Sequence, residues 1–238
     1  TQAILDAAVA NKCKTLDEVK ALPMGKGTVQ DAVTDRSGIT GEKMELDGYN
    51  VVEGAYTTVY NHMGKNQLCT IAAFNKESEE AAHNIAMQIA AMSPQYISRE
   101  DISDEELAKM REITIDSALN DVSSLPKPIQ KDIFAEAFAS DALNAEDKAV
   151  LEEKQNDKYL FNFLSKEAIA ALAAIAMSKK EAIMANKIFN GLVEGRISKQ
   201  LKEVCLLDQT YVMAADGKQT VKAYLAEVSK EVGATVAL

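Results

Sequence analysis

The fold is decided by the stretch EGRISKQLKEVCLLDQTYVM, which occupies residues 194–213. Its first half has the spacing of a helix that ends in a basic turn. Its second half, Glu203 to Met213, has the character of a strand. Gly217 then favours a turn, and Thr220 to Val228 has a helical pattern. The end of the chain is therefore predicted to run from a strand into a helix.

A second strand-and-helix unit is predicted between residues 50 and 92. Residues 50–60 and 68–74 are rich in Val, Thr, Tyr and Ile, and a Gly-containing turn lies between them, which predicts a β-hairpin. Ser78 is a favourable N-cap residue, and the apolar residues of 82–92 recur at helical spacing. Hairpin and helix together predict an α+β layer.

The chain before this hairpin is predicted to form two short helices and a loop. Residues 1–22 carry apolar side chains at helical spacing, and Thr15 with Glu18 forms a capping box for the second helix. Pro23 stops that helix. Residues 35–41 are rich in turn-forming residues and are expected to be irregular.

An all-helical region begins at Ser103, which forms a second capping box with Glu106. Pro126 and Pro128 interrupt it. Further helical patterns cover residues 129–140, 145–155 and 158–190. The composition is too apolar for a disordered linker.

These patterns predict an α+β fold with three parts. Two small antiparallel sheet-plus-helix subdomains are expected at residues 1–102 and 190–238. Residues 103–189 are expected to form a long all-helical insertion between them, of the kind used for dimerisation. The dense aromatic group at residues 159–163 suits the core of that insertion, and a docking patch is the alternative.

Composition favours a protein partner over nucleic acid. The chain has 238 residues with 36 acidic and 26 basic side chains, a net charge of -10, whereas nucleic-acid affinity depends on Lys and Arg. Cys13, Cys69 and Cys205 are odd in number and widely spaced, which indicates neither a disulfide framework nor a zinc site and fits a cytoplasmic location. The longest apolar run, residues 168–177, is too short to span a bilayer.

No catalytic, cofactor or metal site is predicted. His62 and His83 are the only histidines, and neither lies in a cluster with ligand spacing. The Gly-Lys-Gly-Thr run at residues 25–28 lacks the glycine spacing of a phosphate-binding loop and does not follow a strand. We find no nucleophile motif.

Three segments resemble one protein family. The stretch at 194–213 closely resembles a segment of bacterial translation elongation factor Ts. The residues DAAVA at 6–10 and GEKM at 41–44 resemble the "LDAAVA…GENI" spacing of the family, and IAMQIAAMSP at 85–94 resembles its "IAMHVAASKP" helix. All lie in the expected order. Residues 103–189 match only as a helical region of unusual length.

The chain also departs from the family pattern. It opens at Thr1 without the N-terminal helical module and the Thr-Asp-Phe motif that precede "LDAAVA" in the family, and it ends at Leu238 within the closing strand. We interpret it as a fragment, in which the sheet of the hairpin lacks strands. The Phe of that motif wedges into elongation factor Tu in the family, so no residue here is assigned to the wedge.

The resemblance implies a guanine-nucleotide exchange factor for elongation factor Tu, which is not an enzyme because no bond is made or broken. The implied partner-binding residues lie on one helix flank and one loop: Asn84, Gln88, Ala91, Gln209, Tyr211 and Met213. The position of Gln88 carries a polar side chain that touches elongation factor Tu in the family. We therefore expect Gln88 to be exposed, and Gln88→Ala to weaken partner binding with little loss of stability.

A different class of function is also compatible with the residues. The helical insertion suits a scaffold or dimerisation protein without exchange activity, and a homodimer is possible. The matches on both sides of the insertion favour the exchange factor, because a scaffold would not need them. Neither function requires a cofactor, a membrane or direct contact with nucleic acid.

Overall fold

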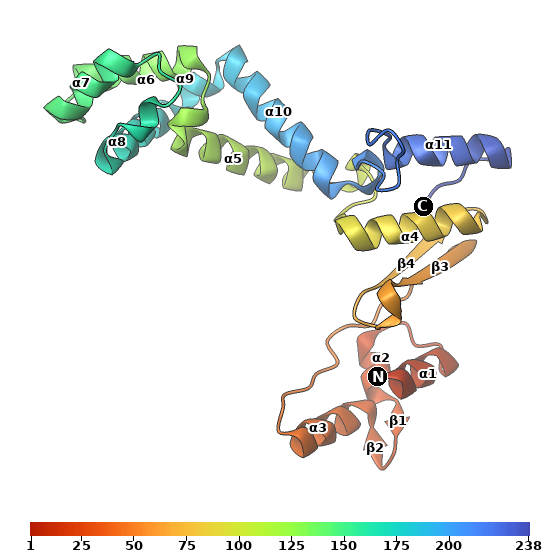
Figure 1. The fold of residues 1–238 in the computed structure, drawn as a ribbon. Helices are drawn as coiled ribbons and strands as arrows, with labels where there is room; N and C mark the ends of the chain where they lie inside the picture. The colour runs from red at the N-terminus through yellow and green to blue at the C-terminus, as the bar shows by residue number, and fades with distance from the viewer. The chain divides into compact units, whose positions relative to one another are not determined.

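The computed structural model describes residues 1–238 and divides into two compact units. The first contains residues 1–86 with 236–238, and the second contains residues 87–235. The predicted α+β class is confirmed, because eleven α-helices are combined with two antiparallel two-stranded sheets (Figure 1). The division at residues 102 and 189 stays a prediction, and every helix of the proposed insertion lies within the second unit.

The first 49 residues form a small helical cluster in the first unit. Its elements are α1 (Gln2–Ala10), α2 (Leu16–Ala21), β1 (Pro23–Met24), β2 (Gly27–Thr28) and α3 (Val29–Thr40). Thr15 and Thr28 begin α2 and α3 with capping boxes, in which the threonine hydroxyl satisfies a free N–H of the first turn. Ala8, Val19 and Val29 are buried at the centre of the cluster.

The expected irregular segment at residues 35–41 is wrong, since residues 35–40 belong to α3. The capping box of Thr28 with Asp31 satisfies the start of this helix, and Gly41 ends it with a φ of 72°. Glycine adopts that left-handed conformation without steric cost. Favourable groups at both ends outweigh the weak helix propensity of the Thr, Ser and Gly residues between them.

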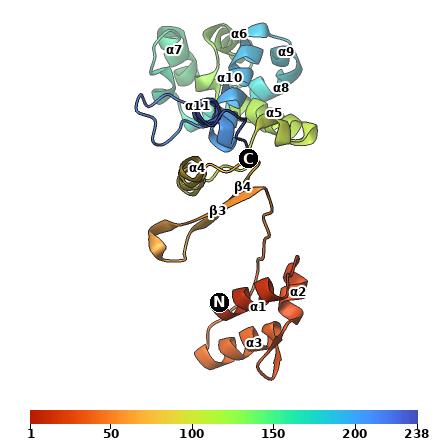
Figure 2. The same ribbon diagram turned by 90° about the vertical axis from the view of Figure 1, so that its right-hand side faces the viewer.

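The predicted hairpin and the helix after it are present. Strands β3 (Tyr56–Asn61) and β4 (Cys69–Phe74) pair in antiparallel register, with Tyr56 opposite Phe74, and α4 covers Glu79–Met92 (Figure 2). Ala72 and Phe74 point into the core, whereas the paired Val59 and Ile71 are exposed on the other face. No third strand joins this sheet.

Most of the second unit is helical and shares one hydrophobic core. Its helices after α4 are α5 (Asp104–Asn120), α6 (Lys127–Ala139), α7 (Ala145–Lys154), α8 (Lys166–Ser178), α9 (Lys180–Met184), α10 (Lys187–Val204) and α11 (Val221–Val232). Helices α5 and α10 pack together (Figure 1), and Leu119, Leu172 and Phe189 are fully buried in the core. Arg111 of α5 joins the pair by contacting Asn190 and Glu194 of α10.

Two predicted elements of this unit are wrong. The pattern at residues 158–190 is not one helix but a short 3-10 turn, α8, α9 and the start of α10. The predicted strand at 203–213 is instead the end of α10, a 3-10 turn at Leu206–Asp208 and a loop. Cys205, Leu206 and Tyr211 are buried without a strand ladder, and only isolated bridges form there, such as Thr210 with Thr220. The second sheet of the protein lies at residues 23–28.

A buried carboxylate connects the starts of two helices in this unit. Asp147 in the first turn of α7 accepts hydrogen bonds from the backbone N–H of Ser165 at 2.9 Å and from its hydroxyl at 2.7 Å. Asn144 donates a further bond at 2.7 Å, and Ser165 is itself the N-cap of α8. The bonds from Ser165, then that from Asn144, lower the pKa of Asp147 because they favour its charged form.

This network predicts a loss of stability in acid. A carboxyl group with a lowered pKa stabilises the fold above its unfolded pKa of about 3.9, and that stabilisation is lost as the pH falls through the lower folded-state pKa. Asp147→Asn should cost about 1 to 3 kcal/mol at pH 7 and should flatten the acid limb of the stability profile. Urea unfolding followed by circular dichroism measures both effects. Asp141→Asn, an exposed carboxylate beside α7, is the control, and equal losses in the two variants would contradict the assignment.

Candidate functional site

Two glutamine side chains form a buried amide pair in the second unit. Gln88 on α4 donates from Nε2 to Oε1 of Gln209 and to the carbonyl oxygen of Thr210, both at 3.1 Å. Its Oε1 accepts the backbone N–H of Val212 at 2.8 Å. Gln88 is 0% exposed and Gln209 is 1% exposed. Each atom of the Gln88 amide is therefore used, and α4 is fastened to the loop after α10.

Gln209 extends this network to the helices on both sides of the loop. Its Nε2 donates to the carbonyl oxygen of Glu203 in the last turn of α10 at 2.8 Å. Its own carbonyl oxygen accepts the N–H of Val221, the first residue of α11, at 3.0 Å. The loop is consequently held by α4, α10 and α11 together.

An aromatic stack and a turn support the rest of the loop. The rings of Tyr211 and Tyr224 are stacked with centroids 4.2 Å apart, and the Tyr211 N–H donates to Gln219 at 2.8 Å. The Asp216 carboxylate accepts the N–H groups of Lys218 and Gln219, each at 2.9 Å. These two bonds lower the pKa of Asp216. The turn that returns the chain to α11 is thereby fixed.

Backbone contacts connect the segment after α4 to the same region. The N–H groups of Gln95 and Tyr96 donate to the carbonyl oxygen of Val204, and the N–H of Leu206 donates to Tyr96 at 2.9 Å. Nearby, Cys205 is fully buried, which raises the pKa of its thiol and keeps it protonated at neutral pH. We assign this cysteine a packing role.

The tip of the loop is apolar and open to solvent. Val212 is 47% exposed and Met213 is 55% exposed, although Gln209 and Tyr211 earlier in the same loop are buried. An apolar tip on a hydrogen-bonded base suits contact with a protein, because apolar area is available for burial and little ordering is needed. The arrangement offers no nucleophile paired with a base.

The predicted partner-binding residues fall into two groups. The exposure expected for Gln88 is wrong, because its amide is buried and hydrogen-bonded within the protein. Asn84, Gln209 and Tyr211 are buried as well. Ala91 and Met213 are exposed. The network brings Gln88 and Gln209 together although they are 121 residues apart in sequence. Whether any of the six contacts a partner stays a prediction.

The groups that complete the network were not predicted from the sequence: they are the backbone groups of Glu203 and Thr210 and the ring of Tyr224. Backbone partners leave no signal in a sequence. Helical spacing gave no signal for the burial of Gln88: Ala81, Ala82, Ile85 and Ala86 form one apolar stripe on α4, and Gln88 lies at its edge.

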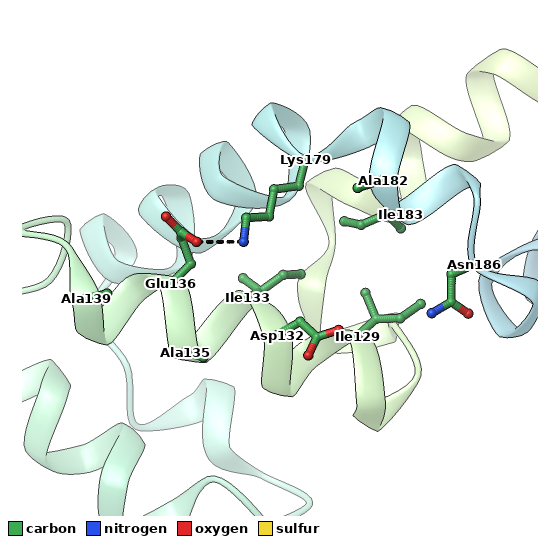
Figure 3. A pocket seen from close by; sticks show the side chains of 10 residues that line it. All are labelled: Ile129, Asp132, Ile133, Ala135, Glu136, Ala139, Lys179, Ala182, Ile183 and Asn186. Atoms are coloured by element: carbon green, nitrogen blue, oxygen red, sulfur yellow. Dashed lines mark hydrogen bonds and ion pairs between the residues drawn. The ribbon is translucent and has the colours of Figure 1, made fainter.

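A groove between α6 and α9 is a second candidate, with a volume of about 440 Å³. Figure 3 shows Ile133 and Ile183 in its wall and an ion pair between Lys179 and Glu136 across one end, at 2.6 Å. Asp132 and Asn186 lie toward the other end. The side chains form no catalytic pair, and nothing here indicates an occupant.

Metal-binding and membrane-spanning features are absent from the structure. No group of three or more His, Cys, Asp or Glu side chains could hold a metal ion. None of the helices combines the length and the apolar character needed to cross a lipid bilayer.

Comparison with known proteins identifies the family. The family model "Elongation factor TS" matches residues 1–238. The chain belongs to this family. A protein named elongation factor Ts from Parabacteroides distasonis is 52% identical to it, and one from Phocaeicola vulgatus is 50% identical. A third, from Bacteroides thetaiotaomicron, is 46% identical. Each alignment covers 97% of this chain and 68% of the relative.

The loop after α10 and the end of α4 thus lie within the part of the chain that matches the elongation factor Ts family, which confirms the resemblance drawn from residues 85–94 and 194–213. Helices α6 to α9 also lie within the aligned region of these relatives. The long helical region is therefore shared with them.

The burial of Gln88 reverses the stability effect expected from the sequence. Gln88→Ala should lower the free energy of unfolding by about 2 to 4 kcal/mol, because it leaves a cavity and removes partners from Val212, Thr210 and Gln209. Met92→Ala, an exposed change one turn further along α4, should stay within about 0.5 kcal/mol. Urea titrations of both variants measure the difference. If Gln88→Ala left the free energy of unfolding unchanged, the hydrogen bonds of the amide pair would not form in solution.

Proposed function

We propose that this chain promotes the release of guanine nucleotide from elongation factor Tu. The observation that carries the proposal is the family match over residues 1–238. The site supports it, because a loop with an exposed apolar tip and a hydrogen-bonded base is suited to contact a folded protein. The place of action would be the cytoplasm, where translation occurs.

Exchange of this kind needs no chemical step. A factor that binds nucleotide-free elongation factor Tu more tightly than the GDP-bound form must, by linkage, weaken GDP binding by the same ratio. A factor with equal affinity for both forms would shift nothing. The residues of the loop therefore act through differential binding, and no general acid, base or metal is required of this chain.

Val212 and Met213 are the side chains that we assign to partner contact in the second unit. They are exposed, apolar and adjacent, and the Val212 backbone is fixed by Gln88. Ala91 lies on the exposed part of α4, close in sequence to Gln88. Gln209 and Tyr211 would contribute by holding the loop from within the protein. Asn84 is buried on α4, and its contact with the partner stays a prediction.

A scaffold without exchange activity is the alternative, and one observation favours it. A single core extends from Ile102 to Cys205 and makes the helical body the largest part of the second unit. Such a body is suited to hold another protein or a second copy of the chain. Nucleotide-release kinetics and light scattering on the same samples separate the two functions.

Met213→Ala should weaken binding to elongation factor Tu about five- to thirtyfold, the range of one to two kcal/mol typical of an apolar interface residue. Stability should change by less than about 1 kcal/mol, since the side chain is exposed and its sulfur is only a weak acceptor for the Tyr211 hydroxyl, at 3.6 Å. Stopped-flow release of fluorescent GDP, at several concentrations of the chain, measures the effect. Ile113→Ala on α5 is the matched control, because Ile113 is an apolar side chain that is 58% exposed and belongs to a different element from the loop.

Release of GDP at the spontaneous rate at every concentration of the chain would contradict the exchange function. Equal losses of affinity for elongation factor Tu in Met213→Ala and Ile113→Ala would leave the exchange function in place. They would show that the loop tip does not contact the partner. A second copy bound in the absence of elongation factor Tu, with no acceleration, would support the scaffold.

A further inference from the structure

Gln88 and Gln209 together form a directional chain of hydrogen bonds. The chain starts at the Val212 N–H, which donates to Gln88 Oε1, continues from Gln88 Nε2 to Gln209 Oε1, and ends with Gln209 Nε2 donating to the Glu203 carbonyl oxygen. Both side chains thus accept at one atom and donate at the other. Only a carboxamide of this length fills either position without leaving a donor or an acceptor unpaired.

We propose that this amide pair is a positioning element, which holds the loop at residues 209–213 in its partner-binding conformation before any partner arrives. The inference rests on the proposed function and deepens it. Gln88 does not touch the partner, because it is fully buried. It acts through the backbone at Thr210 and Val212, on both sides of Tyr211 and next to the exposed Met213.

The geometry explains why the loop needs such a device. No strand ladder holds residues 209–213, where the bridge between Thr210 and Thr220 is isolated. Without regular pairing, the loop would lose conformational entropy on docking, which weakens binding for each residue that has to be fixed. The bonds from Gln88 fix two backbone groups in advance. The conformational entropy of the loop is therefore lost when the protein folds and the two amides are buried. It is not lost when the partner binds.

Positioning and mere support of the fold predict different results when both glutamines are replaced. Gln88→Met keeps the side-chain volume but leaves Gln209 Oε1 buried without a donor, so stability falls. Gln88→Met with Gln209→Met removes both partners of that bond but also takes the Gln209 donor from the Glu203 carbonyl oxygen. Because that carbonyl is only partly buried and can bind water, whereas the amide oxygen of Gln209 is fully buried, part of the lost stability should return. The Val212 N–H and the Thr210 carbonyl still lack Gln88 in the double variant. Stability should therefore recover in part while the backbone of the loop remains without its two bonds to Gln88.

Three measurements on the full chain test this inference. Hydrogen exchange of the peptide that contains Val212 reports on the loop in the free protein, urea unfolding reports on stability, and titration with nucleotide-free elongation factor Tu reports on affinity. We expect Gln88→Met to speed exchange at the loop and to weaken affinity, each about tenfold. The double variant should recover part of the stability but neither loop protection nor affinity. Gln200→Met, which replaces an exposed glutamine on α10, is the matched control. It should leave exchange at the loop, stability and affinity unchanged.

Recovery of affinity together with stability in the double variant would overturn the proposal, as would unchanged exchange at the loop in Gln88→Met. If the unaltered chain does not bind elongation factor Tu at all, the proposed function fails. Hydrogen exchange in the free protein then still decides whether the amide pair orders the loop.

Discussion

A buried carboxamide must have partners for both its donor and its acceptor, and much of the second unit is arranged around this requirement. Gln88 and Gln209 satisfy each other and the backbone near them, so α4, the end of α10 and the start of α11 have to meet at one place. Apolar packing alone would tolerate small shifts of these helices. Hydrogen bonds at 2.8 to 3.1 Å do not, because their strength falls steeply with distance and angle.

The sequence predicted the elements whose signals are local. The capping boxes at Thr15 and Ser103, the hairpin and the start of α6 near Pro126 all depend on residues within a few positions of one another. Where neighbours distant in sequence decide the outcome, prediction failed. The apolar stretch at 203–213 has the composition of a strand, yet no strand lies beside it to complete a ladder. Composition records that a segment is buried but not what buries it.

The same limit applies to the candidate site. The family resemblance directed attention to one helix and one loop, and both contain residues of the amide network. Helical spacing placed Gln88 at the edge of an apolar stripe and could not show that a second surface covers that edge, because the covering residue is Gln209, 121 positions away. Met213 was predicted from the apolar character of the loop, and its exposure agrees with a role at the surface.

The stacked tyrosines give this loop its own optical signal. The chain has seven tyrosines and no tryptophan, so its near-ultraviolet circular dichroism comes chiefly from tyrosine. Two rings 4.2 Å apart and tilted by 15° couple their transitions far more strongly than isolated rings do. Such signals vanish when side chains lose fixed packing, even where helices persist. Loss of fixed packing at Tyr211 and Tyr224 can therefore be followed by circular dichroism without a label. The fluorescence of tryptophan in a protein partner can be excited separately, at a wavelength longer than tyrosine absorbs.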